Sequence, residues 1–91
     1  HNSNIKKWFI EELNKIGFKA YNTQANFTFV KIPENPKQNA KKLNEYLLSN
    51  GIAVRYLLSY GIPDGLRITF GTKDELLKTL ELIKIFINSN E

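Results

Sequence analysis

The chain has 91 residues, of which 42% are hydrophobic, and this length is typical of a single domain with a modest core. It has no cysteine, which excludes disulfides and thiolate metal sites. Its single histidine is His1, a terminal residue that is as easily a cloning remnant as native sequence. Histidine-based catalysis and metal binding are therefore excluded as well. No signal-peptide pattern is present and no apolar run approaches the ~18 residues of a membrane span, so we expect a cytoplasmic domain with no membrane partner.

The net charge of +4 raises the question of nucleic-acid binding. The lysines are scattered along the chain, however, and fall mostly on the polar faces of predicted helices, as solvated surface residues do. The aromatic motif typical of four-stranded RNA-recognition sheets is absent. We therefore expect no nucleic-acid partner.

The first element in chain order is a predicted helix. Its apolar residues recur at helical spacing and form one stripe: Ile5, Trp8, Phe9, Leu13 and Ile16. Residues 2–4, Asn-Ser-Asn, offer caps at its start. Gly17 is expected to end it, with Phe18 folding back onto Leu13 as in a Schellman motif.

Two strands and a second helix follow. Residues 18–21 and 25–32 are predicted as strands, the latter from its aromatic and β-branched content. Asn35 and Pro36 predict the start of the second helix, as a cap followed by proline at the first helical position. Its buried stripe would consist of Ala40, Leu43, Tyr46 and Leu47. Residues 50–51, Asn-Gly, are expected to end it.

The second half contains two more strands and a third helix. Residues 52–58 and 66–70 are predicted strands, joined by a loop rich in turn residues. Thr72 and Glu75 form a predicted capping box for a helix that runs to about residue 88. The apolar stripe of this helix is too wide for one partner, so we expect it to contact two neighbours, one of them outside this chain.

The element order is therefore α-β-β-α-β-β-α. It predicts a single α+β domain over residues 1–91, with a small, mainly antiparallel sheet and helices on one face. The ferredoxin-like split unit is the nearest general description.

Two arginines stand out in the last two strands. Strand side chains alternate between faces, so Leu66 and Ile68 share the core face while Arg67 lies on the other. The same reasoning places Arg55 on the open face of its strand. If the strands are neighbours, two like charges lie close together, which is destabilising unless an anion lies between them. A guanidinium binds carboxylate or phosphate by two hydrogen bonds.

Alternation alone leaves two interpretations of these arginines open. Arginines on exposed sheet faces are ordinarily solvated or paired with carboxylates, so an anion site is one possibility of two. The strand at residues 25–32 adds an observation, because Phe27 and Phe29 face one way and Val30 and Ile32 the other. Both of its faces are apolar, which indicates that something covers the open face of the sheet.

Three segments together are similar to one enzyme family. "TQANFTFVKI", "NGIAVRYL" and "YGIPDGLRITFGTKDE", spanning about Thr23 to Glu75, occur in the order typical of it. The chain resembles the C-terminal small domain of the histidinol-phosphate aminotransferases, which are pyridoxal-phosphate enzymes of the aspartate-aminotransferase-like fold. The flanking helices fit the same plan. No single segment is specific, but the ordered set is.

The resemblance implies roles for both arginines. Arg67 occupies the position of the arginine that binds the substrate's anionic group, either an α-carboxylate or a phosphate. Arg55 occupies the position of a second arginine that supports recognition of the phosphate or distal carboxylate. The family's cofactor lysine, in a Ser-Lys pair before a glycine-rich stretch, is absent. Pyridoxal phosphate is therefore expected in the parent enzyme and not on this chain, which alone is expected to be inactive.

The resemblance also implies partners: the large cofactor-binding domain of the parent chain, a second subunit in a homodimer, and a small amino-acid or phosphate substrate. Two alternatives stay open. The chain could belong to a related decarboxylase of phosphorylated amino acids, or it could be a standalone α+β module that binds a small anion through Arg55 and Arg67.

Overall fold

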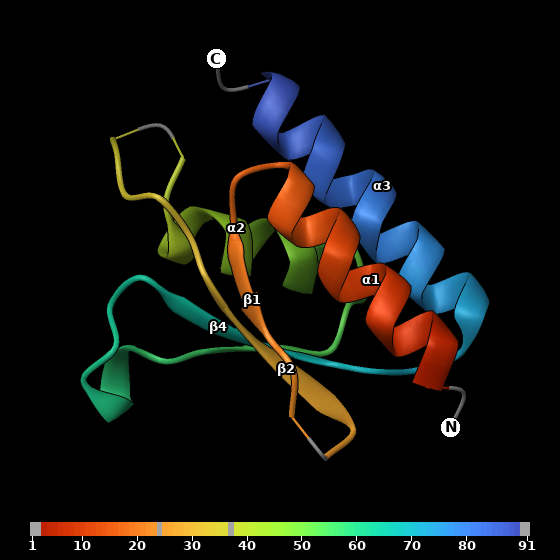
Figure 1. Cartoon of the computed structure of the whole chain (residues 1–91). Coiled ribbons are helices and arrows are strands. Elements are labelled where there is room, and N and C mark those ends of the chain that lie inside the picture. The colour runs from red at the N-terminus through yellow and green to blue at the C-terminus, as the bar shows by residue number, and fades with distance from the viewer. Residues whose placement is uncertain (1–2, 24, 37, 90–91) are drawn as a thin grey trace.

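A computed structural model of the chain describes residues 3–23, 25–36 and 38–89. The elements in chain order are α1 (Ser3–Lys15), β1 (Lys19–Tyr21), β2 (Phe27–Lys31), α2 (Ala40–Ser49), β3 (Val54–Tyr56), a 3-10 turn (Leu58–Tyr60), β4 (Gly65–Thr69) and α3 (Lys73–Ser89). Apart from the short 3-10 turn, this is the predicted order, and the predicted α+β class is confirmed (Figure 1).

The four strands form one sheet in the order β1-β2-β4-β3, and every neighbouring pair is antiparallel. Because β4 pairs antiparallel with both β2 and β3, those two strands run parallel, with α2 as their connection and β4 between them. This is a split β-α-β unit, as predicted. The helices lie on one face of the sheet and bury its inward residues, among them Val30, Leu66 and Ile68.

The first helix ends as predicted. The N–H of Gly17 donates to the carbonyl of Asn14 at 3.1 Å, and the N–H of Phe18 donates to the carbonyl of Leu13 at 3.2 Å. Gly17 has a φ of 97°, which suits glycine, so the pair of bonds is a Schellman motif. At the other end, Ser3 begins the helix and lies within it rather than before it, whereas Asn2 lies outside the described residues.

The predicted start of the second helix is wrong by four residues. α2 begins at Ala40, and its cap is Asn39, whose side chain accepts a hydrogen bond from the N–H of Lys42 at 2.9 Å. Asn35 instead closes a separate turn, because its side-chain oxygen accepts from the N–H of Gln38 at 2.7 Å. The local Asn-Pro pair predicts a helix start, but the cap that satisfies a free N–H of the first helical turn is Asn39, through its bond from Lys42.

The strand predicted over residues 52–58 is also shorter in the structure. Its first residues are used to end α2, since the N–H of Ile52 donates to the carbonyl of Leu47 at 3.0 Å and Gly51 has a φ of 81°. Its last residue, Leu58, begins the 3-10 turn. Only Val54–Tyr56 remain as strand β3, with Arg55 at the centre.

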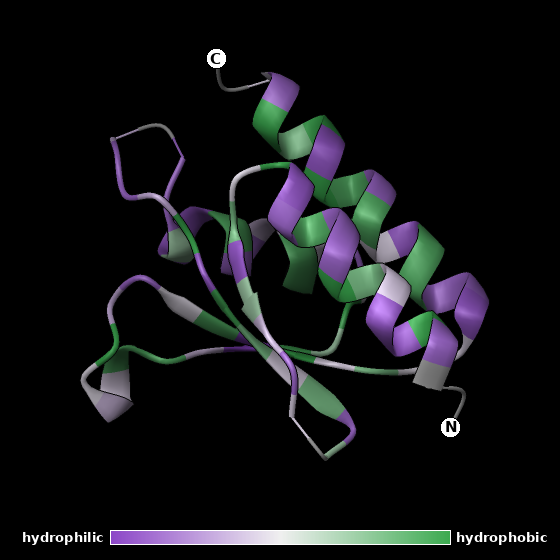
Figure 2. Ribbon diagram, viewed as in Figure 1, coloured by the Kyte–Doolittle hydropathy of each residue, from purple (hydrophilic) through white to green (hydrophobic). Residues whose placement is uncertain are grey.

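The third helix begins with the predicted capping box. The N–H of Thr72 donates to the Glu75 carboxylate at 3.0 Å, and the N–H of Glu75 donates to the Thr72 hydroxyl at 3.2 Å. The wide apolar stripe of α3, visible in Figure 2, meets both α1 and α2, so two partners lie within this chain. Leu77 and Ile85 stay exposed. None of the helices in the described ranges has the length and apolarity needed to cross a membrane.

Candidate anion-binding site

The two arginines lie directly opposite each other on the open face of the sheet. Arg67, at the centre of β4, is in register with Arg55 on β3 and with Phe29 on β2. Arg67 is half-buried and Arg55 is exposed. The placement expected from alternation therefore agrees with the register, and the strand order adds an aromatic neighbour on the other side of Arg67.

The hydrogen-bond pattern of the sheet decides which neighbour is nearer to Arg67. In an antiparallel pair of strands, directly opposed residues alternate between hydrogen-bonded and non-hydrogen-bonded pairs. The N–H of Thr69 donates to the carbonyl of Ala53 at 3.2 Å, so the opposed pair two positions away, Arg55–Arg67, is also hydrogen-bonded. On the β2 side, the N–H of Phe70 donates to the carbonyl of Asn26 at 2.7 Å. Phe29–Arg67 lies three positions away from that pair and is therefore a non-hydrogen-bonded pair. Side chains approach more closely in that type, so Arg67 is nearer to the aromatic strand.

The guanidinium of Arg67 lies against an aromatic ring. Its central carbon is 5.3 Å from the ring centroid of Phe27, which is within the range of a cation–π contact. Phe27 in turn contacts Phe29 edge to face, with centroids 5.1 Å apart and planes at 71°. Neither Arg67 nor Arg55 forms an ion pair with a carboxylate in the parts of the chain that the structure describes. Their cationic heads are therefore available to an external anion.

A hollow of about 310 Å³ lies beside Arg67 on the same face. Its other walls are apolar or aromatic: Phe29, Leu57, Tyr60 and Ile62. Gly65 lets the β3–β4 loop fold down onto the sheet, because a Cβ there would be only 2.6 Å from the Ile62 side chain. The hydroxyl of Tyr56 also fixes this loop by donating to the carbonyl of Pro63 at 3.1 Å. The loop thus forms one wall beside the guanidinium.

The core holds the arginine strand from behind. Leu66 and Ile68, on either side of Arg67, are 0% and 1% exposed. A strand fixed in this way limits the positions that the Arg67 side chain can reach. The arrangement is what a preorganised binding residue requires.

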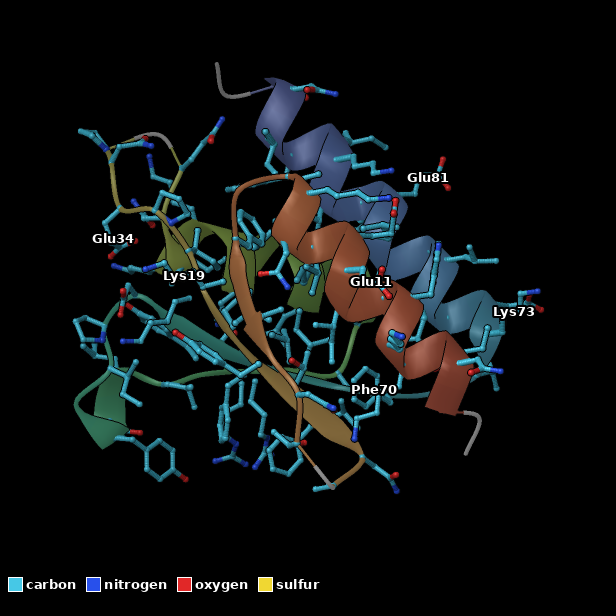
Figure 3. All side chains as sticks on the ribbon, viewed as in Figure 1. Glu11, Lys19, Glu34, Phe70, Lys73 and Glu81 are labelled. Carbon is cyan, nitrogen blue, oxygen red and sulfur yellow. The ribbon has the colours of Figure 1, made fainter. Side chains whose placement is uncertain are left out.

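A second pair of opposed cations contrasts with the arginines. Lys19 on β1 is in register with Lys31 on β2, and both line a hollow of about 360 Å³. Two carboxylates, Glu34 and Asp64, line the same hollow, and Figure 3 shows Lys19 and Glu34 on the same side of the molecule. Its charges are therefore balanced, so this hollow is a poorer candidate for an anion than the arginine pair.

The described lysines do not suit the cofactor that the family resemblance implies. A lysine that forms a Schiff base is held in a site with lowered access to water. No lysine in residues 3–23, 25–36 and 38–89 is buried. Lys6 is the best held, but its ammonium donates to the carbonyls of Thr23 and Ala25 and so fixes the β1–β2 turn. Among the described residues, no set fits pyridoxal phosphate, and none forms a cluster of metal ligands.

Sequence reasoning missed the contact between Phe27 and Arg67. It placed Phe27 and Phe29 on one face but could not place that face beside the arginines. The missing information was the strand order, because β2 ends at Lys31, β4 begins only at Gly65, and the neighbours of β4 are set by tertiary packing. The walls contributed by Tyr60 and Ile62 were missed for the same reason, since both lie in the loop.

Comparison with known proteins relates the chain to one family. The family model for aminotransferase class I and II matches residues 4–83. Relatives named histidinol-phosphate aminotransferase include those of Clostridium botulinum, 36% identical over 91% of this chain, and Lactococcus lactis subsp. lactis, 37% identical over 91% of it. The relative of that name from Paramagnetospirillum magneticum is 32% identical over 98% of the chain.

The chain is short beside these proteins. It spans 23%, 22% and 24% of the lengths of the three relatives, which is about a quarter. A crystal structure of a proposed aminotransferase from Burkholderia pseudomallei superposes with a TM-score of 0.74 over 91% of this chain and 24% of its own, at 20% identity. At that identity the superposition establishes the fold alone.

Proposed function

The chain belongs to the aminotransferase class I and II family, and we propose that it is the C-terminal small domain of a pyridoxal-phosphate-dependent aminotransferase acting on histidinol phosphate. The substrate is suggested by the relatives' shared name, histidinol-phosphate aminotransferase. In this proposal the chain does not hold the reacting centre. It contributes the residues that bind and orient the substrate's anionic end.

The observation that carries the proposal is the opposed arginine pair. Arg55 and Arg67 are register partners on an open face, without an ion pair among the described residues. Such a pair destabilises a sheet when nothing lies between its members. A phosphate, with its several oxygens, can accept hydrogen bonds from both guanidinium groups. We assign the primary anion contact to Arg67 and a supporting contact, for a phosphate or distal carboxylate, to Arg55.

The rest of the parent protein supplies what this chain lacks. Pyridoxal phosphate, when bound, provides the electron sink for amino transfer, and its lysine would come from the large domain. We place that domain over the open face of the sheet and expect a homodimer, as the resemblance implies. The cytoplasmic location expected from the sequence stays a prediction.

The proposal is tested in the complete protein by steady-state kinetics with histidinol phosphate. If Arg67 binds the anion in a water-poor cleft, removing the guanidinium leaves the substrate's negative charge buried without a partner. Arg67→Ala should therefore lower kcat/KM by at least ~10²-fold. Arg67→Lys should restore part of the loss, since it keeps the charge but not the two-pronged geometry. Arg55→Ala should weaken the binding of histidinol phosphate more than the binding of a substrate with a single carboxylate.

The control is Lys78→Ala, which removes an exposed cation from α3 in the helix layer and should leave kcat/KM within about twofold. An Arg67→Ala enzyme as active as the wild type would exclude the anion-binding role. Unfolding of that variant in a thermal melt would instead make Arg67 a structural residue. The decarboxylase alternative needs a different substrate, because histidinol phosphate has no carboxylate to lose. Release of carbon dioxide from a phosphorylated amino acid, without amino transfer, would identify that alternative.

A further inference from the structure

We propose that Phe27 is a positioning residue for Arg67: its ring holds the guanidinium toward β2 in the orientation that receives the substrate anion. The inference rests on the proposed function and deepens it, because it asks what orients an arginine that has no carboxylate partner. Ordinarily such a side chain is held by an ion pair. Here the described contacts offer an aromatic face instead.

The register explains how the ring reaches the guanidinium. Phe27 is the partner of Thr69, which lies two residues beyond Arg67 on β4 and on the same face. Phe27 and Arg67 are therefore diagonal neighbours across the β2–β4 pair, a spacing that long side chains bridge. The guanidinium carbon lies 5.3 Å from the ring centroid, so the two side chains do bridge it.

The ring is itself fixed on two sides. Phe29 contacts it edge to face with centroids 5.1 Å apart. The backbone of Phe27 is tied to the preceding turn, because the Thr23 hydroxyl donates to the Phe27 carbonyl at 2.5 Å. Lys6 from α1 holds that turn through the carbonyls of Thr23 and Ala25. A platform held in this way can restrict a guanidinium, which a mobile side chain could not do.

An aromatic face suits this task better than a carboxylate would. A carboxylate would neutralise the guanidinium and compete with the substrate anion for its N–H donors. A ring attracts the cation through its quadrupole yet accepts none of the in-plane hydrogen bonds, so those donors stay free for a phosphate or carboxylate. The contact also lowers the number of positions Arg67 samples before binding, which favours affinity.

The size of the effect follows from the strength of the contact. Cation–π contacts range from weak at exposed sites to stronger when desolvated, and Arg67 is half-buried. Losing the ring should therefore raise KM for histidinol phosphate about three- to tenfold. Because the phosphate lies away from the reacting bond, the loss is of uniform binding, and kcat should stay within about twofold.

The experiment is a double-mutant cycle in the complete holoenzyme with histidinol phosphate as the probe. It compares the wild type, Phe27→Leu, Arg67→Ala and the double variant. Phe27→Tyr keeps the ring and should retain the wild-type KM, whereas Phe27→Ile is a second ring-free variant that suits a strand. Leu48→Ala is the control, since it removes an exposed apolar side chain from α2, in the helix layer and away from the open face of the sheet.

Two results together support the inference. KM should rise in the ring-free single variants, and the same substitution should change KM less than twofold when Arg67 is already alanine. A wild-type KM in Phe27→Leu and Phe27→Ile overturns the inference, as does an equal rise with and without Arg67. In those cases Arg67→Ala alone still lowers kcat/KM, so the proposed function stands. If Arg67→Ala has no effect, both fall.

Discussion

Replacing Arg55 by glutamine removes one of two cations that face each other across β3 and β4. Most substitutions destabilise a protein, but here we expect the isolated domain to become slightly more stable. The reason is that Arg55 is exposed, forms no ion pair among the described residues, and faces a like charge. Residues kept for binding commonly carry such a cost in stability.

The magnitude follows from the geometry of the pair. The two residues form a hydrogen-bonded pair, for which the Cα atoms are about 5.5 Å apart. Guanidinium heads on long side chains can separate further, and unit charges about 6–12 Å apart in water repel by roughly 0.3–0.7 kcal/mol. For a domain of this size that energy corresponds to a rise in Tm of about 1–5 °C.

The assay is chemical and thermal denaturation of the wild type, Arg55→Gln, Arg67→Gln and the double variant. The cycle isolates the pair from the general effect of lowering the net charge of +4. Arg67→Gln alone should be nearly neutral, because it relieves the repulsion but also loses the contact with Phe27. The repulsive coupling should fade in 1 M salt, where the Debye length is about 3 Å.

A destabilising Arg55→Gln substitution at low salt would refute this reasoning. It would mean that Arg55 has a favourable partner in the folded domain. A coupling energy that does not change with salt would also contradict it, because the term would then not be electrostatic. Either result would weaken the case that the arginine pair is kept for an anion.

Two further predictions concern the helix cap and the cofactor. Thr72→Ala should destabilise the domain by about 0.5–2 kcal/mol in denaturant titrations. The N–H and hydroxyl of Thr72 lower the pKa of Glu75 from its ordinary 4.5, so the stability that the Glu75 carboxylate contributes should be complete above pH 4.5 and lost as the pH falls through the lowered pKa. Glu75→Gln should abolish this pH dependence. The isolated chain mixed with pyridoxal phosphate should show no stable Schiff-base absorption that depends on one particular lysine, and such a band would show that a cofactor lysine lies in this chain.

The strands show how far local pattern reaches. Alternation placed Arg67 opposite in direction to Leu66 and Ile68, because successive side chains must point to opposite faces. It likewise placed Arg55 on an open face. Alternation says nothing about which strands are neighbours, so the pairing of the two arginines was conditional until the sheet order β1-β2-β4-β3 was known. The roles of the two residues stay predictions.

Short-range sequence signals set the features that depend on a few adjacent residues. The ends of α1 and α2 follow from glycine's access to positive φ, and the start of α3 follows from the three-residue spacing of Thr72 and Glu75. The local signal misleads at Asn35, whose side chain accepts from Gln38 in a separate turn, whereas Asn39 caps α2. Local chemistry thus set the element order and the class of fold.

The surroundings of Arg67 depend instead on long-range packing. β4 lies between β2 and β3, with Val30, Leu66 and Ile68 buried under the helices. The register of β2 with β4 then brings Phe27 diagonally across from Arg67. The loop after β3 folds onto the same face because Gly65 leaves room for Ile62. These contacts join segments distant in sequence, and the free energy that selects them is shared by the whole core, so no local pattern specifies them.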